Sequence, residues 1–192
     1  PVLVSGTDGV GPKLKIAFEK AAQATANRAK KGYVALFVRD EKAQGVHALS
    51  SDALIPSELG EANKTYVKLC FQGSDRGSPS LVYLVVIAPG TDDTTALEGG
   101  LKSIEAYSID YLAGPPDVTD QELAKLVEWV KAQREIYRTV KLVKPWKNAG
   151  SDNMGIIELD ESGMTDKDGA VTAAEYCGRI AGILGEKNIN KV

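Results

Sequence analysis

The chain contains few residues that could form a catalytic centre. His47 is its single histidine, and with Asp40 and a serine it could supply the base and the orienting acid of a hydrolase triad. A serine nucleophile needs a strained turn with backbone donors around it, and no Gly-x-Ser-x-Gly pattern occurs. His47 lies in a polar stretch after an apolar run, so we interpret it as a solvated loop residue. The sequence therefore predicts no catalytic residues and no enzyme activity.

A second candidate is a partial match to a calcium-binding loop that starts at Met164. Positions three, five, six and twelve of such a loop are held by Asp166, Asp168, Gly169 and Glu175. The first ligand position is Met164, whose sulfur cannot replace a carboxylate for a hard cation. A turn followed by a helix cap explains the same residues, so we expect no metal site.

Glycines, tryptophans and lysines supply the remaining candidates. The segment 6–11 (GTDGVG) could cradle a phosphate, but Pro12 and a strand-like pattern follow it instead of a helix, so we expect no cofactor. Trp129 and Trp146 could form an aromatic platform, although partial burial explains both. Three lysines, Lys141, Lys144 and Lys147, alternate or nearly so and are interpreted as the wet face of a strand.

The elements that would position these residues follow from the hydrophobic pattern. Apolar runs predict strands at 33–38, 81–87, 109–113, 140–143 and 156–159, and the first two are apolar throughout, as in strands covered on both faces. Amphipathic patterns separate the runs. This alternation predicts an α/β domain, a mostly parallel sheet with helices on both faces and right-handed crossovers.

The helices carry recognisable start signals. Ser57 is expected to cap a helix that buries Leu59, Ala62, Tyr66, Leu69 and Cys70. Capping boxes are expected at Thr119 with Glu122 and at Thr172 with Glu175. The buried stripes after them are predicted as Leu123, Leu126, Val127, Val130 and Tyr137, and as Tyr176, Ile180, Ile183 and Leu184. A weaker helix is expected at 94–104.

Composition limits the class of protein. The 192 residues are 43% hydrophobic and carry a net charge of −3, which fits one globular domain with an arm and argues against a nucleic-acid binder. No apolar run approaches about 18 residues and no signal peptide is recognisable, so we expect an intracellular product without a membrane partner. Cys70 and Cys177 are expected to be reduced and buried.

The first 31 residues differ from the rest. Residues 1–12 are rich in turn formers, whereas Leu14, Ile16 and Phe18 alternate with small or charged residues as in a half-buried strand. We therefore divide the chain into an N-terminal arm with one strand, residues 1–31, and an α/β domain, residues 32–192.

Ordered segments of the chain are similar to one known family, the tail sheath proteins of contractile phages and phage-like particles, in particular the PBSX-like type. The segments are GYVALFVRD (32–40), IP (55–56), EANKTYV (61–67), LVYLVV (81–86), IDYL (109–112), EWVK (128–131) with Arg134, GII (155–157) and TAAEYCGRIAGI (172–183). Family members continue beyond the last segment into a second region with a C-terminal arm. The chain thus resembles a fragment or truncated form.

This resemblance implies a structural protein whose copies assemble around a tail tube. Its implied partners are copies of itself and the tube protein, with no small-molecule substrate, in a virion tail and, during assembly, in the host cytoplasm. The implied domain has a subtilisin-like, non-catalytic topology. Family members exchange terminal arms by strand addition, which assigns subunit contacts to the arm strand of Leu14, Ile16 and Phe18.

Two alternatives remain open. Residues 1–19 (PVLVSGTDGVGPKLKIAFE) are also similar to the ATP-binding segment of aminoimidazole ribonucleotide synthetase, which would place Asp8 and Lys13 near nucleotide and metal. That family's later glycine-rich and acidic motifs are absent. A generic α/β binding domain would instead hold a ligand at the carboxyl ends of the strands, near Asp40, 89–90 and 114–115.

Overall fold

The computed structural model of the chain describes residues 32–74, 77–90, 94–146, 153–160, 165–166, 169–170 and 172–186. The predicted arm strand of Leu14, Ile16 and Phe18, the glycine-rich segment and the synthetase-like segment lie outside these residues, as do Lys147, Met164 and Asp168. The arm and the boundary after residue 31 therefore stay predictions.

A six-stranded, mostly parallel sheet forms the centre of the molecule. Its strands lie in the order β2-β3-β1-β4-β5-β6, and only β2 runs antiparallel to its neighbour. Their bounds are β1 (Tyr33–Arg39), β2 (Gly45–Leu49), β3 (Leu81–Ile87), β4 (Tyr111–Ala113), β5 (Lys141–Pro145) and β6 (Ile156–Leu159). A separate two-stranded hairpin joins β7 (Thr165–Asp166) to β8 (Gly169–Ala170).

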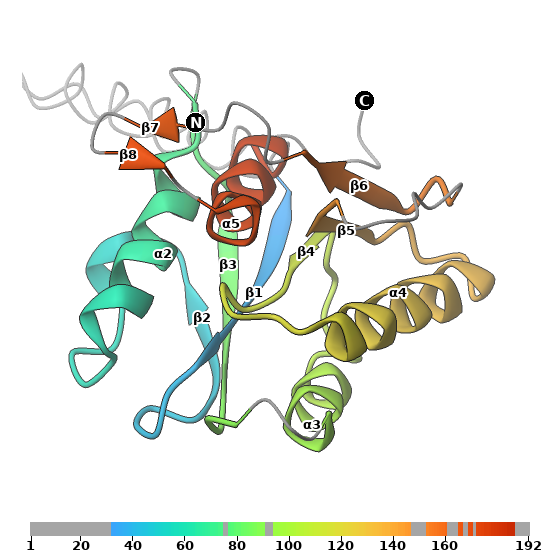
Figure 1. Cartoon of the computed structure of the whole chain (residues 1–192), viewed down its shortest axis with the longest axis horizontal. Helices are drawn as coiled ribbons and strands as arrows, with labels where there is room; N and C mark the ends of the chain where they lie inside the picture. Colours follow the sequence, from blue (N-terminus) through green and yellow to red (C-terminus); the bar gives the residue numbers. More distant parts are fainter. Residues whose placement is uncertain are drawn as a thin grey trace, which may run out of the picture.

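Helices cover both faces of the sheet, which confirms the predicted fold class (Figure 1). One face carries α2 (Glu61–Gln72) and α5 (Ala173–Leu184), and the other carries α3 (Thr95–Ser103) and α4 (Asp120–Glu135). Alternate residues of β1 supply the two cores: Val34, Leu36 and Val38 face α2 and α5, whereas Ala35 and Phe37 face α3 and α4. No helix of the described residues is long and apolar enough to cross a membrane.

Strand β2 is the element that the hydrophobic pattern missed. His47 lies in the middle of this strand, half-buried and opposite Leu84 of β3, so the prediction of a solvated loop is wrong. The segment GVHAL has too few large apolar residues to be recognised as a strand. The segment is a strand because its backbone hydrogen-bonds to the outer edge of β3, and this pairing cannot be recognised from the local pattern.

Helix α2 begins later than predicted. Its N-cap is Gly60 rather than Ser57, because the carboxylate of Asp40 accepts a hydrogen bond from the Gly60 N–H at 2.8 Å. Leu59 is buried but precedes the helix, and Ala62 is exposed. The short 3₁₀ helix η1 (Asp52–Leu54) occupies part of the preceding loop.

The two predicted capping boxes are both present, at the starts of α4 and α5. The predicted stripe of α4 is wrong at Tyr137, which lies beyond the helix, is 95% exposed and has a φ of 64°. On α5 the fully buried positions are Cys177, Gly178, Ala181 and Gly182, whereas Tyr176, Ile180, Ile183 and Leu184 are half-buried. The small residues face inward because α2 approaches α5 very closely.

That approach depends on two glycines. A Cβ atom on Gly182 would lie 1.9 Å from the main-chain oxygen of Cys70, and one on Gly178 would lie 2.6 Å from the Tyr66 ring. Main-chain atoms of α2 therefore occupy the space that a side chain at 182 would need. The Gly-x-x-x-Gly spacing of α5 sets the separation of the two helices.

Candidate functional site

The carboxyl ends of β1 and β4 mark the position where sheets of this kind usually bind ligands. The chain leaves β1 toward β2, which lies beyond β3 on one side, and leaves β4 toward β5 on the other, so the two connections diverge. Such a divergence opens a crevice in many α/β proteins. Asp40 and residues 114–115, which we named as ligand candidates, do lie here.

Arg39 fills this crevice. Its side chain is only 6% exposed, and its Nη2 donates to Glu122 Oε1 and Oε2 at 2.6 and 2.5 Å. Its Nε donates to Asp117 Oδ2 at 3.0 Å. Glu122 is 1% exposed and also accepts from the Thr119 N–H at 2.9 Å, which closes the capping box of α4. One carboxylate therefore ties the end of β1 to the start of α4.

Asp40 makes hydrogen bonds that stabilise the fold. Its carboxylate accepts hydrogen bonds from the main-chain N–H groups of Gly60 and Lys42, at 2.8 and 3.0 Å, and from Asn63 Nδ2 at 3.0 Å. These donors, with Gly60 first, hold the pKa of Asp40 below its usual value. Asn63 also donates to the Arg39 carbonyl at 2.7 Å. Asp40 thus anchors the start of α2.

Tyr66 closes the other side of the crevice. Its hydroxyl, buried under α5, donates to the carbonyl of Gly114 at 2.8 Å. Burial raises the pKa of the Tyr66 hydroxyl well above its usual value, so it remains a donor. Side chains of the protein itself therefore occupy the place where a ligand would sit.

The other predicted residues are not assembled into a reactive centre. His47 Nε2 lies 2.7 Å from the Ala43 carbonyl and shares no hydrogen bond with Asp40. Cys70 and Cys177 are buried thiols outside any disulfide, as predicted, and burial raises the pKa of each thiol to about 12. The described residues contain no cluster of three or more histidine, cysteine or acidic side chains able to hold a metal ion.

Lys144 corrects the interpretation of the lysines as a wet face. Its side chain is 8% exposed, and its Nζ lies 2.8 Å from Glu158 Oε1 on the neighbouring strand. The two tryptophans are partly buried, as expected from the sequence: Trp129 is half-buried and Trp146 is 50% exposed.

The ion pair of Arg39 and Glu122 was not anticipated. Two signals bear on it: a charged residue that ends an entirely apolar strand, and a glutamate whose capping-box role brings it to the carboxyl edge of the sheet. Neither signal identifies the partner, because their contact spans 83 positions of the sequence.

Comparison with known proteins gives a fold but no family. No family model matches the chain, and no curated protein matches it. Among solved structures it is similar to the sheath tail protein of Desulfitobacterium hafniense, with a TM-score of 0.64 and 12% identity over 82% of this chain. The chain spans 59% of that protein's length. A second similarity is to the helical sheath of the anti-feeding prophage in its contracted state, with a TM-score of 0.48, 17% identity and coverage of 70% and 42%.

These findings define the chain as a three-layer α/β domain with the fold of part of a sheath tail protein.

Proposed function

We propose that the chain is a structural subunit, or part of one, of a contractile tail sheath. The observation that carries the proposal is the fold similarity to the Desulfitobacterium hafniense sheath tail protein, which covers most of the chain. The sequence segments that resemble sheath proteins, in order between residues 32 and 183, support the same proposal. The filled crevice around Arg39 also supports a structural role, because it leaves the usual ligand position of an α/β sheet to internal contacts.

The finer parts of the proposal rest on the sequence resemblance. Copies would assemble around a tail tube, in a particle of the PBSX-like type, and the chain would be a fragment or shortened form of the sheath subunit. The strand of Leu14, Ile16 and Phe18 would join a sheet edge of a neighbouring copy through main-chain hydrogen bonds, with alternate side chains in pockets. The protein would act in the particle's tail and assemble in the host cytoplasm, without substrate or cofactor.

Electron microscopy of the protein produced from the complete open reading frame that encodes this chain tests the proposal. We expect tubular polymers with helical order. A triple variant, L14S, I16S and F18S, removes the alternating apolar side chains of the arm and should fold but not polymerise. Substitution of the preceding Lys13 and the intervening Lys15 by serine is the matched control and should leave the polymers intact. Monodisperse monomers of the unmodified protein, under conditions in which sheath particles assemble, would refute a sheath function.

A further inference from the structure

Tyr137 stands at a position where the fold would accept glycine. The left-handed conformation there ends α4, because the main-chain N–H groups of Tyr137 and Arg138 donate to the carbonyls of Arg134 and Gln133, each at 3.0 Å. Tyr137 lies just after α4 with a φ of 64°, in the left-handed region, and its side chain is 95% exposed. For a bulky residue this conformation costs about 1–2 kcal/mol, whereas glycine adopts it freely. Because the ring is exposed, its burial does not offset this cost in the folded domain. Strained residues of this kind concentrate at functional surfaces.

Other exposed apolar side chains lie beside it. Ile136 is 59% exposed and Met154 is 81% exposed. The Met154 loop lies against the end of α4, since a Cβ atom on Gly155 would be 2.6 Å from Arg134 Cδ. Three large apolar side chains are thus presented together at the amino ends of β5 and β6.

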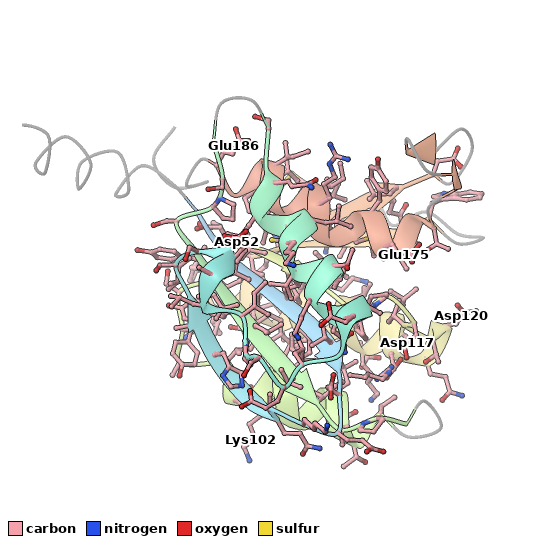
Figure 2. All side chains as sticks on the ribbon, turned by 90° about the vertical axis from the view of Figure 1, so that its left-hand side faces the viewer. Asp52, Lys102, Asp117, Asp120, Glu175 and Glu186 are labelled. Carbon is pink, nitrogen blue, oxygen red and sulfur yellow. The ribbon has the colours of Figure 1, made fainter. Side chains whose placement is uncertain are left out.

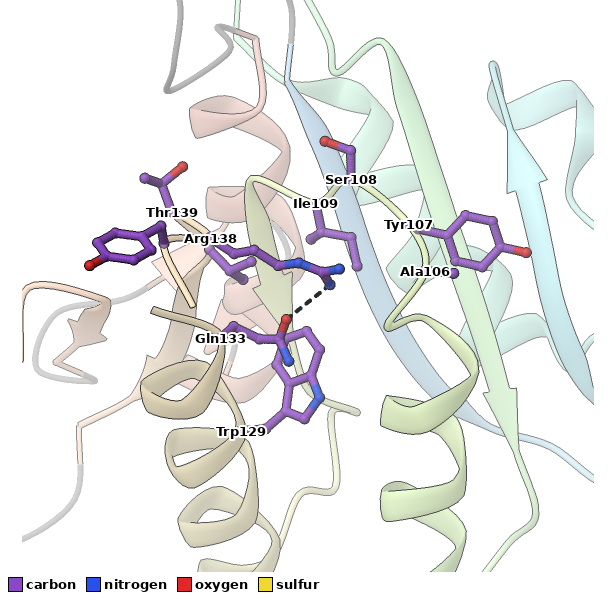
Figure 3. A pocket seen from close by; sticks show the side chains of 10 residues that line it. Ala106, Tyr107, Ser108, Ile109, Trp129, Gln133, Arg138 and Thr139 are labelled. Carbon is purple, nitrogen blue, oxygen red and sulfur yellow. Dashed lines mark hydrogen bonds between the residues drawn. The ribbon is translucent and has the colours of Figure 1, made fainter. Parts of the chain in front are cut away.

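A cavity of about 460 Å³ is lined in part by Tyr137. Trp129 and Gln133 of α4 line it together with Arg138, whose Nη1 donates to Gln133 Oε1 at 3.0 Å and to the Glu105 carbonyl (Figure 3). The buried Nε1 of Trp129 has no hydrogen-bond partner among the described residues. We call the cavity together with Ile136, Tyr137 and Met154 the amino-edge surface. It combines tyrosine, tryptophan, methionine and arginine, the residues enriched at the centres of protein interfaces.

Basic side chains predominate around the amino-edge surface. Four of them lie between the end of α4 and the start of β5: Lys131, Arg134, Arg138 and Lys141. The acidic residues nearby are Glu105 and Glu135. An acidic group that enters the cavity would find N–H donors on the guanidinium of Arg138. The charge and the donors together indicate a partner that presents carboxylates.

The opposite end of the same domain presents such carboxylates. We call this region, at the carboxyl ends of the strands, the acidic edge. Its exposed acidic residues are Glu41, Glu58, Glu61, Asp117 and Asp120, with Lys42 as a basic neighbour. Asp117 pairs with Arg39 and Glu61 with Lys64, so Glu41 and Glu58 are the carboxylates on which a contact at this edge depends most. Figure 2 shows Asp117 and Asp120 close together on one side of the molecule. Parallel strands separate the two regions, so one domain carries a basic surface and an acidic surface at opposite ends.

We propose that the amino-edge surface binds the acidic edge of a second copy of this chain, head to tail. Two different surfaces that complement each other make a heterologous contact, which propagates along a row of copies instead of closing into a dimer. The carboxylates of one copy would meet Arg138 and the basic rim of the next, and Tyr137 would be the apolar anchor. The proposal deepens the proposed function by naming a contact between subunits within the described domain.

Variants that each disable one surface test this contact. The first, K131E with Y137G, removes the anchor and reverses a rim charge. The second, E41K with E58K, reverses two acidic-edge charges outside helices. K68E, an exposed charge reversal on α2, is the matched control. The masses of the 192-residue protein and its variants are measured by sedimentation equilibrium at about 50 mM salt and up to about 1 mM protein.

The unmodified protein and K68E should show a mass that rises with concentration without a fixed end point. Each surface variant alone should associate at least tenfold more weakly, and an equal mixture of the two should form a heterodimer and no larger species. Y137G should melt no lower than the unmodified protein, so lost association cannot reflect unfolding.

A monomeric unmodified protein, unimpaired surface variants, or a mixture that forms no heterodimer would each overturn the proposal. Its failure is separable from that of the sheath function, because the polymer test depends on Leu14, Ile16 and Phe18 and not on these surfaces.

Discussion

Alanine at position 182 would force α2 and α5 apart. A Cβ atom there would lie 1.9 Å from the Cys70 carbonyl oxygen, which belongs to the helix main chain and cannot rotate away. Overpacking of a core costs about 1–3 kcal/mol. The gain in helix propensity from glycine to alanine offsets up to about 1 kcal/mol of this. We expect G182A to lower the free energy of unfolding by about 2 kcal/mol, near the upper end of that range after the offset.

The chain offers two comparison sites in the same kind of element. Gly99 lies exposed within α3, and a Cβ atom there would meet nothing within 4 Å, so G99A should stabilise the protein by about 0.5–1 kcal/mol. At Gly178 the obstacle is the Tyr66 ring, a side chain, so G178A should fall between the two.

Urea unfolding followed by circular dichroism measures all three variants. A change of 2 kcal/mol corresponds to about 4–8 °C in Tm for a domain of this size. The order of stability should be G99A, unmodified protein, G178A and G182A. If G182A is as stable as the unmodified protein, the helices are not held at the separation that the glycines impose, and the argument fails.

Four further outcomes are expected. E122Q, which leaves the buried Arg39 without its main partner, should cost about 3–5 kcal/mol in urea unfolding, whereas D117N, at a 56% exposed carboxylate, should cost less than about 1 kcal/mol. The pKa of Asp40 is lowered from 3.8, so its contribution to stability is present above that pH and is lost as the pH falls below it; D40N should flatten this acid limb of the melting temperature. Cys70 and Cys177, with thiol pKa values raised to about 12, should resist alkylation at pH 8 until urea unfolds the protein. Millimolar Mg-ATP should leave Tm unchanged, and a rise would favour the synthetase-like alternative for residues 1–19.

The elements that sequence predicted best are those in which local pattern and final packing agree. β3 is apolar throughout and occupies the predicted residues, because a strand covered on both faces needs no alternation. The capping boxes at Thr119 and Thr172 were predictable because both partners lie within three residues of each other. Gly100 also fits its place, since a Cβ atom there would lie 2.7 Å from Phe37.

Features that depend on a distant contact could not be predicted from local pattern. β2 is a strand only because β3 pairs with it, and α2 starts at Gly60 because Asp40, 20 residues earlier, caps it. The buried face of α5 was misjudged because large apolar residues suggest burial, whereas here the closeness of α2 selects glycine and alanine. Lys144 is buried because Glu158 lies on the neighbouring strand.

The same long-range contacts bear on function. In an α/β protein that binds a ligand at the carboxyl edge, the crevice must stay open, and the loops around it provide polar groups that are free to bind. Here Arg39 and Tyr66 join β1, α4, α2 and the end of β4 across that edge, so Nη2 and Nε of Arg39 and the Tyr66 hydroxyl have partners within the domain, whereas the buried Nη1 of Arg39 has none among the described residues. The strained Tyr137 and the exposed charges of Glu41, Glu58 and Lys131 face outward, where the contact with a second copy proposed above would form.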